Sequence, residues 1–198
     1  MLYDSIYVYT NEDEVKDMFD IRKMQENALY AAVQKESDAQ IADEVVYGQK
    51  QGAEKEDSAW VNAAMLRLEE RFRFPARVRI RRRCQCGFGM EEKLALLNRL
   101  KDSVSSIEDL TASQEAKAAG LFSENGNLYL QFQFCPCPML KNVKSLRSDT
   151  WCLCTTGYSK ELFEKAFSCE ADVDLLQSIK KGDPVCLMKI TLHNPLWR

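Results

Sequence analysis

The alternation of apolar and polar residues between positions 127 and 135 is the feature that most constrains the fold. The apolar positions are Leu128, Leu130, Phe132 and Phe134, and the residues between them are Tyr129, Gln131 and Gln133. A period of two places alternate side chains on opposite faces, so this segment predicts a strand with one apolar face. Further strands are expected at 173–179 and 185–192, joined by a turn at Gly182-Asp183. In the last strand, Cys186 shares a face with apolar neighbours and points toward the core.

Helical periodicity dominates the rest of the chain, with apolar residues three or four positions apart. Helices are expected from Asn11 to Ala32 and from Ser159 onward, and over 39–46, 57–73, 77–83, 91–110 and 112–119. A short arm or strand is expected at 1–9. The predicted fold class is therefore α/β, of the α+β kind, with an antiparallel sheet packed by helices. We expect an N-terminal helical extension at 1–55 and the main domain at 56–198.

Length and charge limit the classes of function. A chain of 198 residues that is 45% apolar is large enough for one domain with a substantial core. Its formal charge of −3 argues against a general nucleic-acid binder or a polybasic membrane protein. No apolar run approaches the roughly 18 residues of a membrane span, and the first twenty residues are acidic rather than signal-like. We therefore expect a cytoplasmic protein with no membrane partner, and the helical extension leaves room for a homodimer.

Five arginines lie between positions 77 and 83, around Val78 and Ile80. Such a cluster can hold phosphates, but no aromatic platform and no recognition motif accompanies it. We interpret the segment as a short helix leading to Cys84, with its arginines solvated or paired with the acidic residues upstream. An arginine that binds an anionic ligand is the alternative, since guanidinium matches carboxylate. No nucleic-acid partner is expected.

Six of the eight cysteines form three Cys-x-Cys pairs. In a reducing compartment such clustering favours metal or redox chemistry over disulfides. The predicted metal ligands are Cys135, Cys137, Cys152, Cys154 and Cys186. They are expected to converge because Cys186 faces the core and both pairs lie at segment ends, next to Pro136 or Gly157. We expect at least three to bind zinc, which prefers four soft ligands, with an iron–sulfur cluster as the alternative.

Other interpretations of the thiols stay open. Buried cysteines are often only small hydrophobic residues, which is the interpretation for Cys169. Redox-active thiols are a further alternative. Cys84 and Cys86 stand at an expected helix start, where thiol pKa values fall, and form a separate candidate reactive pair.

The sequence offers little for acid–base catalysis. His193 is the only histidine and is interpreted as a surface residue. The aromatic residues Phe134, Trp151, Tyr158 and Phe163 are candidates for the lining of an apolar ligand cavity, with an ordinary core as the alternative.

A family resemblance involves the same part of the chain. GYSKELFEKAF at 157–167, KKGDPVC at 180–186 and LMKITL at 187–192 resemble the C-terminal half of the vinyl-4-reductase-type small-molecule-binding domain. They are also similar to a related bacterial group that includes the aminothiazoline-carboxylate hydrolases. The resemblance implies zinc ligands at Cys152 or Cys154, at Ser178 and at Cys186. Ser178 departs from the pattern because a hydroxyl is a poor zinc ligand, so Cys135 or Cys137 would supply the missing thiolate.

Two functions follow from these observations. The first is a domain that binds or senses a small apolar or aromatic molecule beside a cysteine-held zinc ion. The second is a hydrolase like the aminothiazoline-carboxylate enzymes, in which a thiolate or metal-bound water attacks a ring carbon. A closed four-cysteine site favours the first function, and an open three-ligand site with a nearby carboxylate favours the second.

Overall fold

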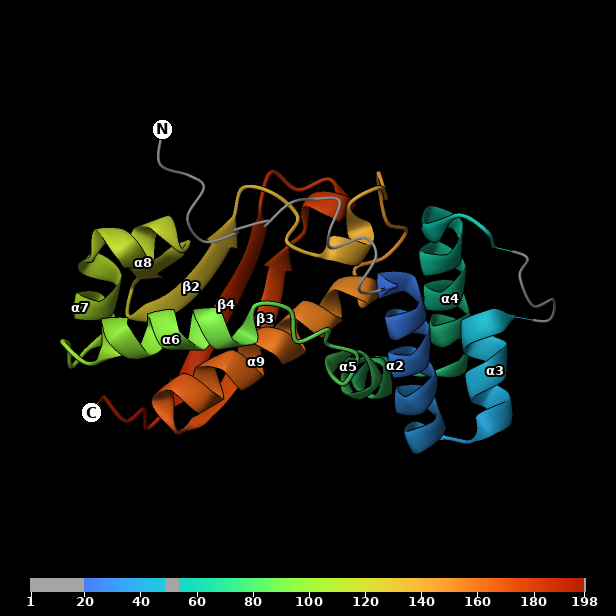
Figure 1. Ribbon diagram of the computed structural model, residues 1–198, viewed down its shortest axis with the longest axis horizontal. Coiled ribbons are helices and arrows are strands. Elements are labelled where there is room, and N and C mark those ends of the chain that lie inside the picture. Colours follow the sequence, from blue (N-terminus) through green and yellow to red (C-terminus); the bar gives the residue numbers. More distant parts are fainter. Residues whose placement is uncertain (1–19, 49–53, 198) are drawn as a thin grey trace.

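The computed structural model describes residues 20–48 and 54–197, and its centre is a four-stranded antiparallel sheet (Figure 1). The strands are β1 (Leu121–Glu124), β2 (Asn127–Phe132), β3 (Glu170–Gln177) and β4 (Cys186–His193). They lie in the order β1-β2-β4-β3, so β4 is paired on both sides. The predicted fold class and the pairing of the last two strands are confirmed.

Helices precede the sheet in the chain, and one long helix crosses it. They are α2 (Ile21–Glu36), α3 (Ala39–Tyr47), α4 (Asp57–Arg71), α5 (Phe74–Arg82), α6 (Met90–Lys101), α7 (Ile107–Ala112), α8 (Gln114–Ala118) and α9 (Leu153–Phe167). In Figure 1 the helices α2 to α5 gather at one end of the molecule and α7 and α8 at the other, with the sheet and α9 between them.

One core cluster lies between the sheet, α9 and α6. Leu128, Met188 and Ile190 supply the apolar face of the sheet, and Phe163 and Phe167 come from α9. The two phenylalanine rings stack at 6.1 Å between centroids. The predicted face of the last strand is confirmed, because Cys186, Met188 and Ile190 are all buried.

A second core cluster lies among α2, α3, α4 and the end of α5. Leu29, Val45 and Trp60 are almost fully buried there, and Trp60 packs edge-on against Trp151 at 5.5 Å. This helical cluster also contains Cys84, Cys152 and Cys154, whereas the sheet cluster lies on the other side of α9. The expected boundary between 1–55 and 56–198 stays a prediction, with α2 and α3 packed on the helices that follow them.

Several element boundaries differ from those expected. The helix predicted over 91–110 ends at Lys101, and a new helix, α7, begins after Ser106, whose hydroxyl caps it by accepting from the Asp109 N–H. The strand predicted to reach 135 ends at Phe132, and β1 was not expected at all. The third strand begins at Glu170 rather than 173.

The largest difference concerns the segment Trp151 to Tyr158. It was expected to turn at Gly157 before a helix beginning at Ser159, but α9 already begins at Leu153. Gly157 is therefore an interior helical residue. A Cβ there would lie 2.3 Å from the Arg82 carbonyl oxygen, so glycine is needed because α5 crosses α9 closely.

The N-terminal helix begins with an identified cap. The Asp20 side chain accepts a hydrogen bond from the Lys23 backbone N–H, which satisfies a free donor of α2. The arm predicted at 1–9 and the helix start predicted at Asn11 lie outside the described residues. None of the helices described is both long and apolar enough to cross a membrane.

Candidate metal centre

The sheet register brings two of the predicted ligands together. Cys186 is the first residue of β4 and is paired with Phe132, the last residue of β2. Cys135 follows three residues later, and its thiol hydrogen-bonds to that of Cys186. This contact joins the end of β2 to the beginning of β4.

The second pair lies at the start of α9, beside the same strand ends. Cys152 is the residue before the helix, and Cys154 is in its first turn. The Cys152 Sγ lies 3.4 Å from the Ser178 Oγ, in the segment between β3 and β4. Cys152 is also electrostatically coupled to Cys135 and Cys186. Cys152, which contacts Ser178, therefore lies in the neighbourhood of the Cys135–Cys186 contact.

Burial keeps most of these thiols protonated. Cys152, Cys154 and Cys186 are each 8% exposed. Burial raises the pKa of Cys152 to about 12 and raises that of Cys154 as well. Cys186 differs, because the hydrogen bond from Cys135 lowers its pKa and raises that of Cys135. A metal ion would have to displace the protons of the other thiols.

The thiols touch in pairs rather than in a complete coordination shell. Within residues 20–48 and 54–197, no three Cys, His, Asp or Glu side chains are already grouped so as to hold a metal ion. All eight cysteines are free thiols. A cysteine sulfur moves by turning about a single bond between staggered rotamers, so a metal centre here would require these side chains to rotate toward one another.

A buried arginine lies at the inner side of this cluster. Arg81 is 0% exposed, and its guanidinium lies 4.2 Å above the Trp151 ring. One nitrogen, Nη2, donates to the Trp151 carbonyl oxygen at 3.0 Å, but Nε and Nη1 have no hydrogen-bond partner. Burial opposes the charge of Arg81, while the neighbouring thiols, Cys84 and Cys154 foremost, raise its pKa overall.

Cys84 belongs to the same cluster, although the sequence set it apart with Cys86. It follows α5, is fully buried and faces Arg81 and Cys154. Its predicted helix-start position is wrong, because α6 begins only at Met90. Burial raises its pKa to about 11, so it is not an activated thiol. The sequence feature that groups Cys84 with the other thiols is its Cys-x-Cys spacing, which the other two cysteine pairs share.

The four aromatic residues expected to line a ligand cavity do not converge. Trp151 is in the helical cluster and Phe163 in the sheet cluster. Phe134 is 49% exposed, and the Tyr158 hydroxyl donates to the Phe88 carbonyl oxygen at 2.9 Å. These four residues therefore do not line one common cavity.

The remaining candidate groups have structural partners. Nε2 of His193 lies 2.8 Å from the Asp172 carboxylate on an exposed part of the sheet. Arg79 and Arg83 of the arginine run both pair with Glu36, and Arg77 pairs with Glu69. These contacts agree with the interpretation of the run as a helix paired with acidic residues.

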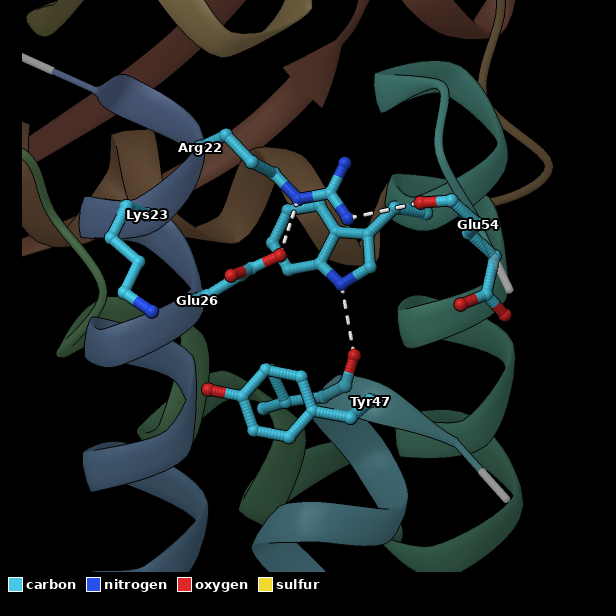
Figure 2. Close-up of a pocket in the computed structure, with 7 residues that line it drawn as sticks. Arg22, Lys23, Glu26, Tyr47 and Glu54 are labelled. Atoms are coloured by element: carbon cyan, nitrogen blue, oxygen red, sulfur yellow. Dashed lines mark hydrogen bonds and ion pairs between the residues drawn. The ribbon is translucent and has the colours of Figure 1, made fainter. Parts of the chain in front are cut away.

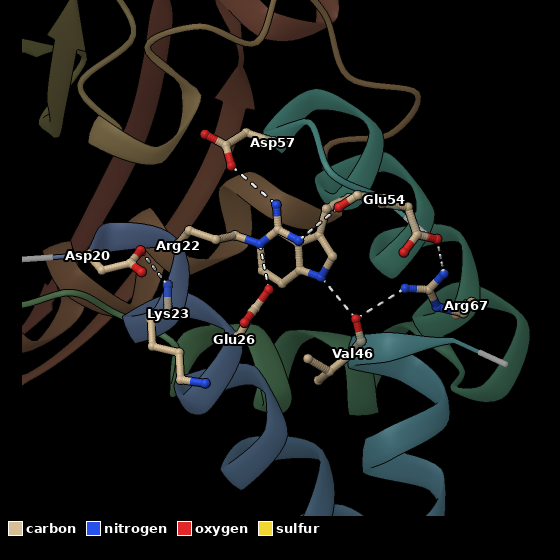
Figure 3. A network of polar contacts seen from close by, with 9 residues as sticks. Asp20, Arg22, Lys23, Glu26, Val46, Glu54, Asp57 and Arg67 are labelled. Atoms are coloured by element: carbon tan, nitrogen blue, oxygen red, sulfur yellow. Dashed lines mark hydrogen bonds and ion pairs between the residues drawn. The ribbon is translucent and has the colours of Figure 1, made fainter. Parts of the chain in front are cut away.

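A hollow lies away from the thiols, between α2, α3 and α4. Figure 2 shows Arg22, Lys23, Glu26, Tyr47 and Glu54 around it, and its volume is about 440 Å³. Figure 3 shows that Arg22 contacts Glu26, Asp57 and the Glu54 carbonyl oxygen. The Arg22 guanidinium also lies 4.2 Å from the centre of the Trp60 ring, so this side chain packs over the helical core cluster.

Fold and site together define a cysteine-rich α+β protein with a buried arginine among its thiols. Residues 18–197 match the Family of unknown function (DUF6144), and the chain belongs to this family. No curated protein and no solved structure matches the chain. The resemblance to vinyl-4-reductase-type domains and aminothiazoline-carboxylate hydrolases stays a prediction.

Proposed function

We propose that this protein is a zinc-binding domain whose metal is held by Cys135, Cys152 and Cys186. The observation that carries the proposal is the hydrogen bond between the thiols of Cys135, after β2, and Cys186, at the start of β4, with Cys152 at the start of α9 close enough to act on both electrostatically. Thiolates are preferred zinc ligands, and their convergence from distant segments is what a metal-binding site requires.

The local chemistry fits zinc. Cys186 accepts a hydrogen bond from Cys135 and another from the Ile179 backbone N–H, and it lies near Lys180. These groups favour its thiolate form, so Cys186 is the natural first ligand. Cys152 precedes a helix of fifteen residues, where the helix dipole also favours negative charge.

Three thiolates leave the fourth position of a tetrahedral ion open. The Ser178 hydroxyl lies on this side, 3.4 Å from the Cys152 sulfur. A hydroxyl is a weak zinc ligand, so water or a small molecule with a sulfur, nitrogen or oxygen donor can take the position. The proposed role is therefore to bind or sense such a molecule through the metal.

The surroundings of the thiols favour sensing over hydrolysis. The groups that act most strongly on these three thiols are other cysteines, Ser178, Lys180 and Arg81. No carboxylate of the described residues is among them. The Asp183 carboxylate lies beside Ser178, but it accepts a hydrogen bond from the Ser178 backbone N–H at 2.7 Å, so it is engaged with the backbone rather than held against a thiol as the general base that the hydrolase alternative requires.

Metal analysis of protein purified without oxygen tests the proposal. We expect zinc in the wild-type protein, and less zinc and a lower melting temperature in Cys152→Ser and Cys186→Ser, because a bound metal stabilises the folded state. Cys169→Ser is the matched control, since Cys169 lies between α9 and β3, apart from the cluster. Its substitution should change neither quantity.

Two results would overturn the proposal. Wild-type protein that carries no metal and does not gain thermal stability from added zinc would show that the thiols are only core residues. Iron and inorganic sulfide in place of zinc would show an iron–sulfur protein instead.

A further inference from the structure

Two loops that lie together form a basic patch on the surface. Residues 141–149 and 179–183 contain five basic and two acidic side chains, although the chain as a whole has a formal charge of −3. The basic patch consists of Lys141, Lys144, Arg147, Lys180 and Lys181. Lys180 is half-buried, and the other four side chains are exposed. Segments that are distant in the sequence therefore bring like charges to one part of the surface.

Backbone contacts hold the two loops together in spite of this like charge. The Leu146 N–H donates to the Lys180 carbonyl oxygen at 2.8 Å. The ammonium groups of Lys180 and Lys181 donate in turn to the carbonyl oxygens of Val143 and Arg147. The side chains of Val143 and Leu146 are buried. The basic patch is therefore built on anchored backbone, and its position on the molecule is fixed by the fold.

The described part of the chain does not neutralise this patch. No carboxylate of the described residues forms an ion pair with Lys144, Arg147, Lys180 or Lys181. Arg71 of α4 differs, since it pairs with Glu44. Asp183 lies beside the patch, but its carboxylate accepts a hydrogen bond from the Ser178 backbone N–H. A gathering of one sign of charge at one place attracts a partner of the opposite charge.

The chain itself contains a segment of matching charge. Residues 12–17 have the sequence Glu-Asp-Glu-Val-Lys-Asp, with four acids and one base, and this stretch is called the acidic segment below. It lies outside the described residues, which begin at Asp20, directly before α2. Helix α2 contacts the short helix η1 (Pro138–Leu140), which directly precedes Lys141 (Figure 1). Ile21, the first residue of α2, packs against the core cluster that contains η1 residues. The acidic segment is therefore joined to the described chain close to the basic patch.

The length of the connection allows the two to meet. An extended chain spans at most about 3.6 Å per residue, so Asp17 lies within roughly 11 Å of Asp20 and Glu12 within roughly 29 Å. Exposed ion pairs are weak, each contributing up to about 1 kcal/mol. Attachment to the same chain compensates for this weakness, because a short connection gives an effective concentration in the millimolar range. Several weak pairs that form together can therefore hold the acidic segment.

We propose that the acidic segment docks on the basic patch of its own chain. Its four carboxylates supply the negative partners that the basic patch lacks among the described residues. The docked segment adjoins η3 (Ile179–Lys181), which directly follows Ser178 and so lies next to the Cys152 contact. Docking is electrostatic, forms no covalent bond and needs no metal, so it is independent of the proposed function. It also closes the basic patch to nucleic acids and other polyanions.

Carbodiimide cross-linking of the full-length chain tests the docking. This reagent joins carboxylates to amines that are in contact, and mass spectrometry identifies the linked residues. We expect links from the acidic segment to the exposed amines of Lys141, Lys144 and Lys181. Mixing unlabelled protein with protein labelled with nitrogen-15 distinguishes links within one chain from links between chains. The links should weaken in about 1 M salt, where the screening length falls to about 3 Å.

Charge reversal in the basic patch provides a matched comparison. Lys144→Glu/Lys181→Glu should reduce the yield of links to Lys141 roughly fivefold or more, because two attractive pairs become repulsive. Lys35→Glu/Lys117→Glu changes the net charge by the same amount at exposed positions of α2 and α8. This control should leave the yield unchanged. Circular dichroism checks that each variant is folded.

A second reversal, in the acidic segment, should restore the contact. Adding Glu12→Lys/Glu14→Lys to Lys144→Glu/Lys181→Glu exchanges the charges of the two surfaces. Links should then form between positions 12 or 14 and positions 144 or 181. A general loss of folding in the first variant would not be repaired in this way, so recovery is specific to the docked contact.

Three results would contradict the docking. Links from the acidic segment to Lys35 and Lys117 that are as abundant as those to the basic patch would show that the segment has no preferred position. Links to the patch that form only between chains would assign the segment to a second copy. A wild-type chain without links between the segment and the patch would show that the patch serves another partner.

Discussion

Gly157 shows how the absence of one side chain positions the thiols. The glycine lets α5 cross α9 so closely that a Cβ would lie 2.3 Å from the Arg82 carbonyl oxygen and 2.7 Å from its Cα. The crossing places Arg81 and Cys84, which lie at the end of α5, beside Cys154 at the start of α9. The close packing of the α5 and α9 backbones therefore determines which side chains lie beside one another at this site.

We predict that Gly157→Ala destabilises the protein by about 3 kcal/mol, the upper part of the usual range for an overpacked core. The clash is with backbone atoms, which cannot rotate away, so the helices must separate. Chemical denaturation measures the free energy of unfolding. Lys165→Ala on the exposed side of the same helix should cost below about 1 kcal/mol, because it removes only a surface pair with Glu161. Equal effects of the two substitutions would contradict this account of Gly157.

Residue spacing predicted part of the site and missed part. The core-facing position of Cys186 followed from the period of two in its strand, and the structure confirms its burial. The positions of Cys84 and Arg81 depend on where α5 crosses α9, which no local pattern encodes. An arginine in a run of five looks like a solvated residue, and only the packed structure shows that Arg81 is buried.

At the scale of elements, α5 illustrates how a basic helix can be structural. Arg79 and Arg83 pair with Glu36 of α2, and Arg77 pairs with Glu69 of α4. Arg82 donates to the Val173 carbonyl oxygen in β3 at 2.8 Å. The arginines thus tie α5 to three neighbouring elements.

We predict no sub-micromolar binding of random duplex or single-stranded nucleic acid at moderate salt, measured by gel shift. The reason is that these guanidinium groups are engaged with carboxylates and carbonyl oxygens, and the chain is acidic overall. Arg79→Ala/Arg82→Ala serves as the comparison. Tight binding by the wild type that this double variant abolishes would contradict the prediction.

Elements with strong periodicity were predicted well, and those defined by their neighbours were not. The strand at 185–192 and the helix over 57–73 correspond closely to β4 and α4. The four-residue strand β1 exists through its pairing with β2, so its own sequence carries little signal. The early start of α9 is not predicted by the local sequence, because glycine is typical of turns, whereas tertiary packing keeps Gly157 helical.

At the scale of the whole molecule, the cysteines lie where the two core clusters meet. Cys84, Cys152 and Cys154 belong to the helical cluster. Cys186 begins β4, one of the two interior strands, which continues into the sheet cluster through Met188 and Ile190. Leu175 packs against both clusters. Metal bound by these cysteines would therefore link two parts of the core that otherwise share few side chains.

The three tryptophans allow this link to be measured. Trp60 and Trp151 lie in the helical cluster, whereas Trp197 packs against Phe167 of the sheet cluster at 5.3 Å. In Trp197→Phe, tryptophan fluorescence therefore reports the helical cluster alone. Far-ultraviolet circular dichroism reports both helices and sheet.

With zinc bound, we expect the fluorescence and circular dichroism of Trp197→Phe to give the same unfolding midpoint, because the metal couples the two clusters into one cooperative unit. After chelation, the fluorescence midpoint should fall below that of circular dichroism, since the helical cluster loses its link to β4. Cys169→Ser in the same background should repeat both results. Coincident midpoints before and after chelation would show that packing alone couples the clusters, and the metal would then have no part in the cooperativity of the fold.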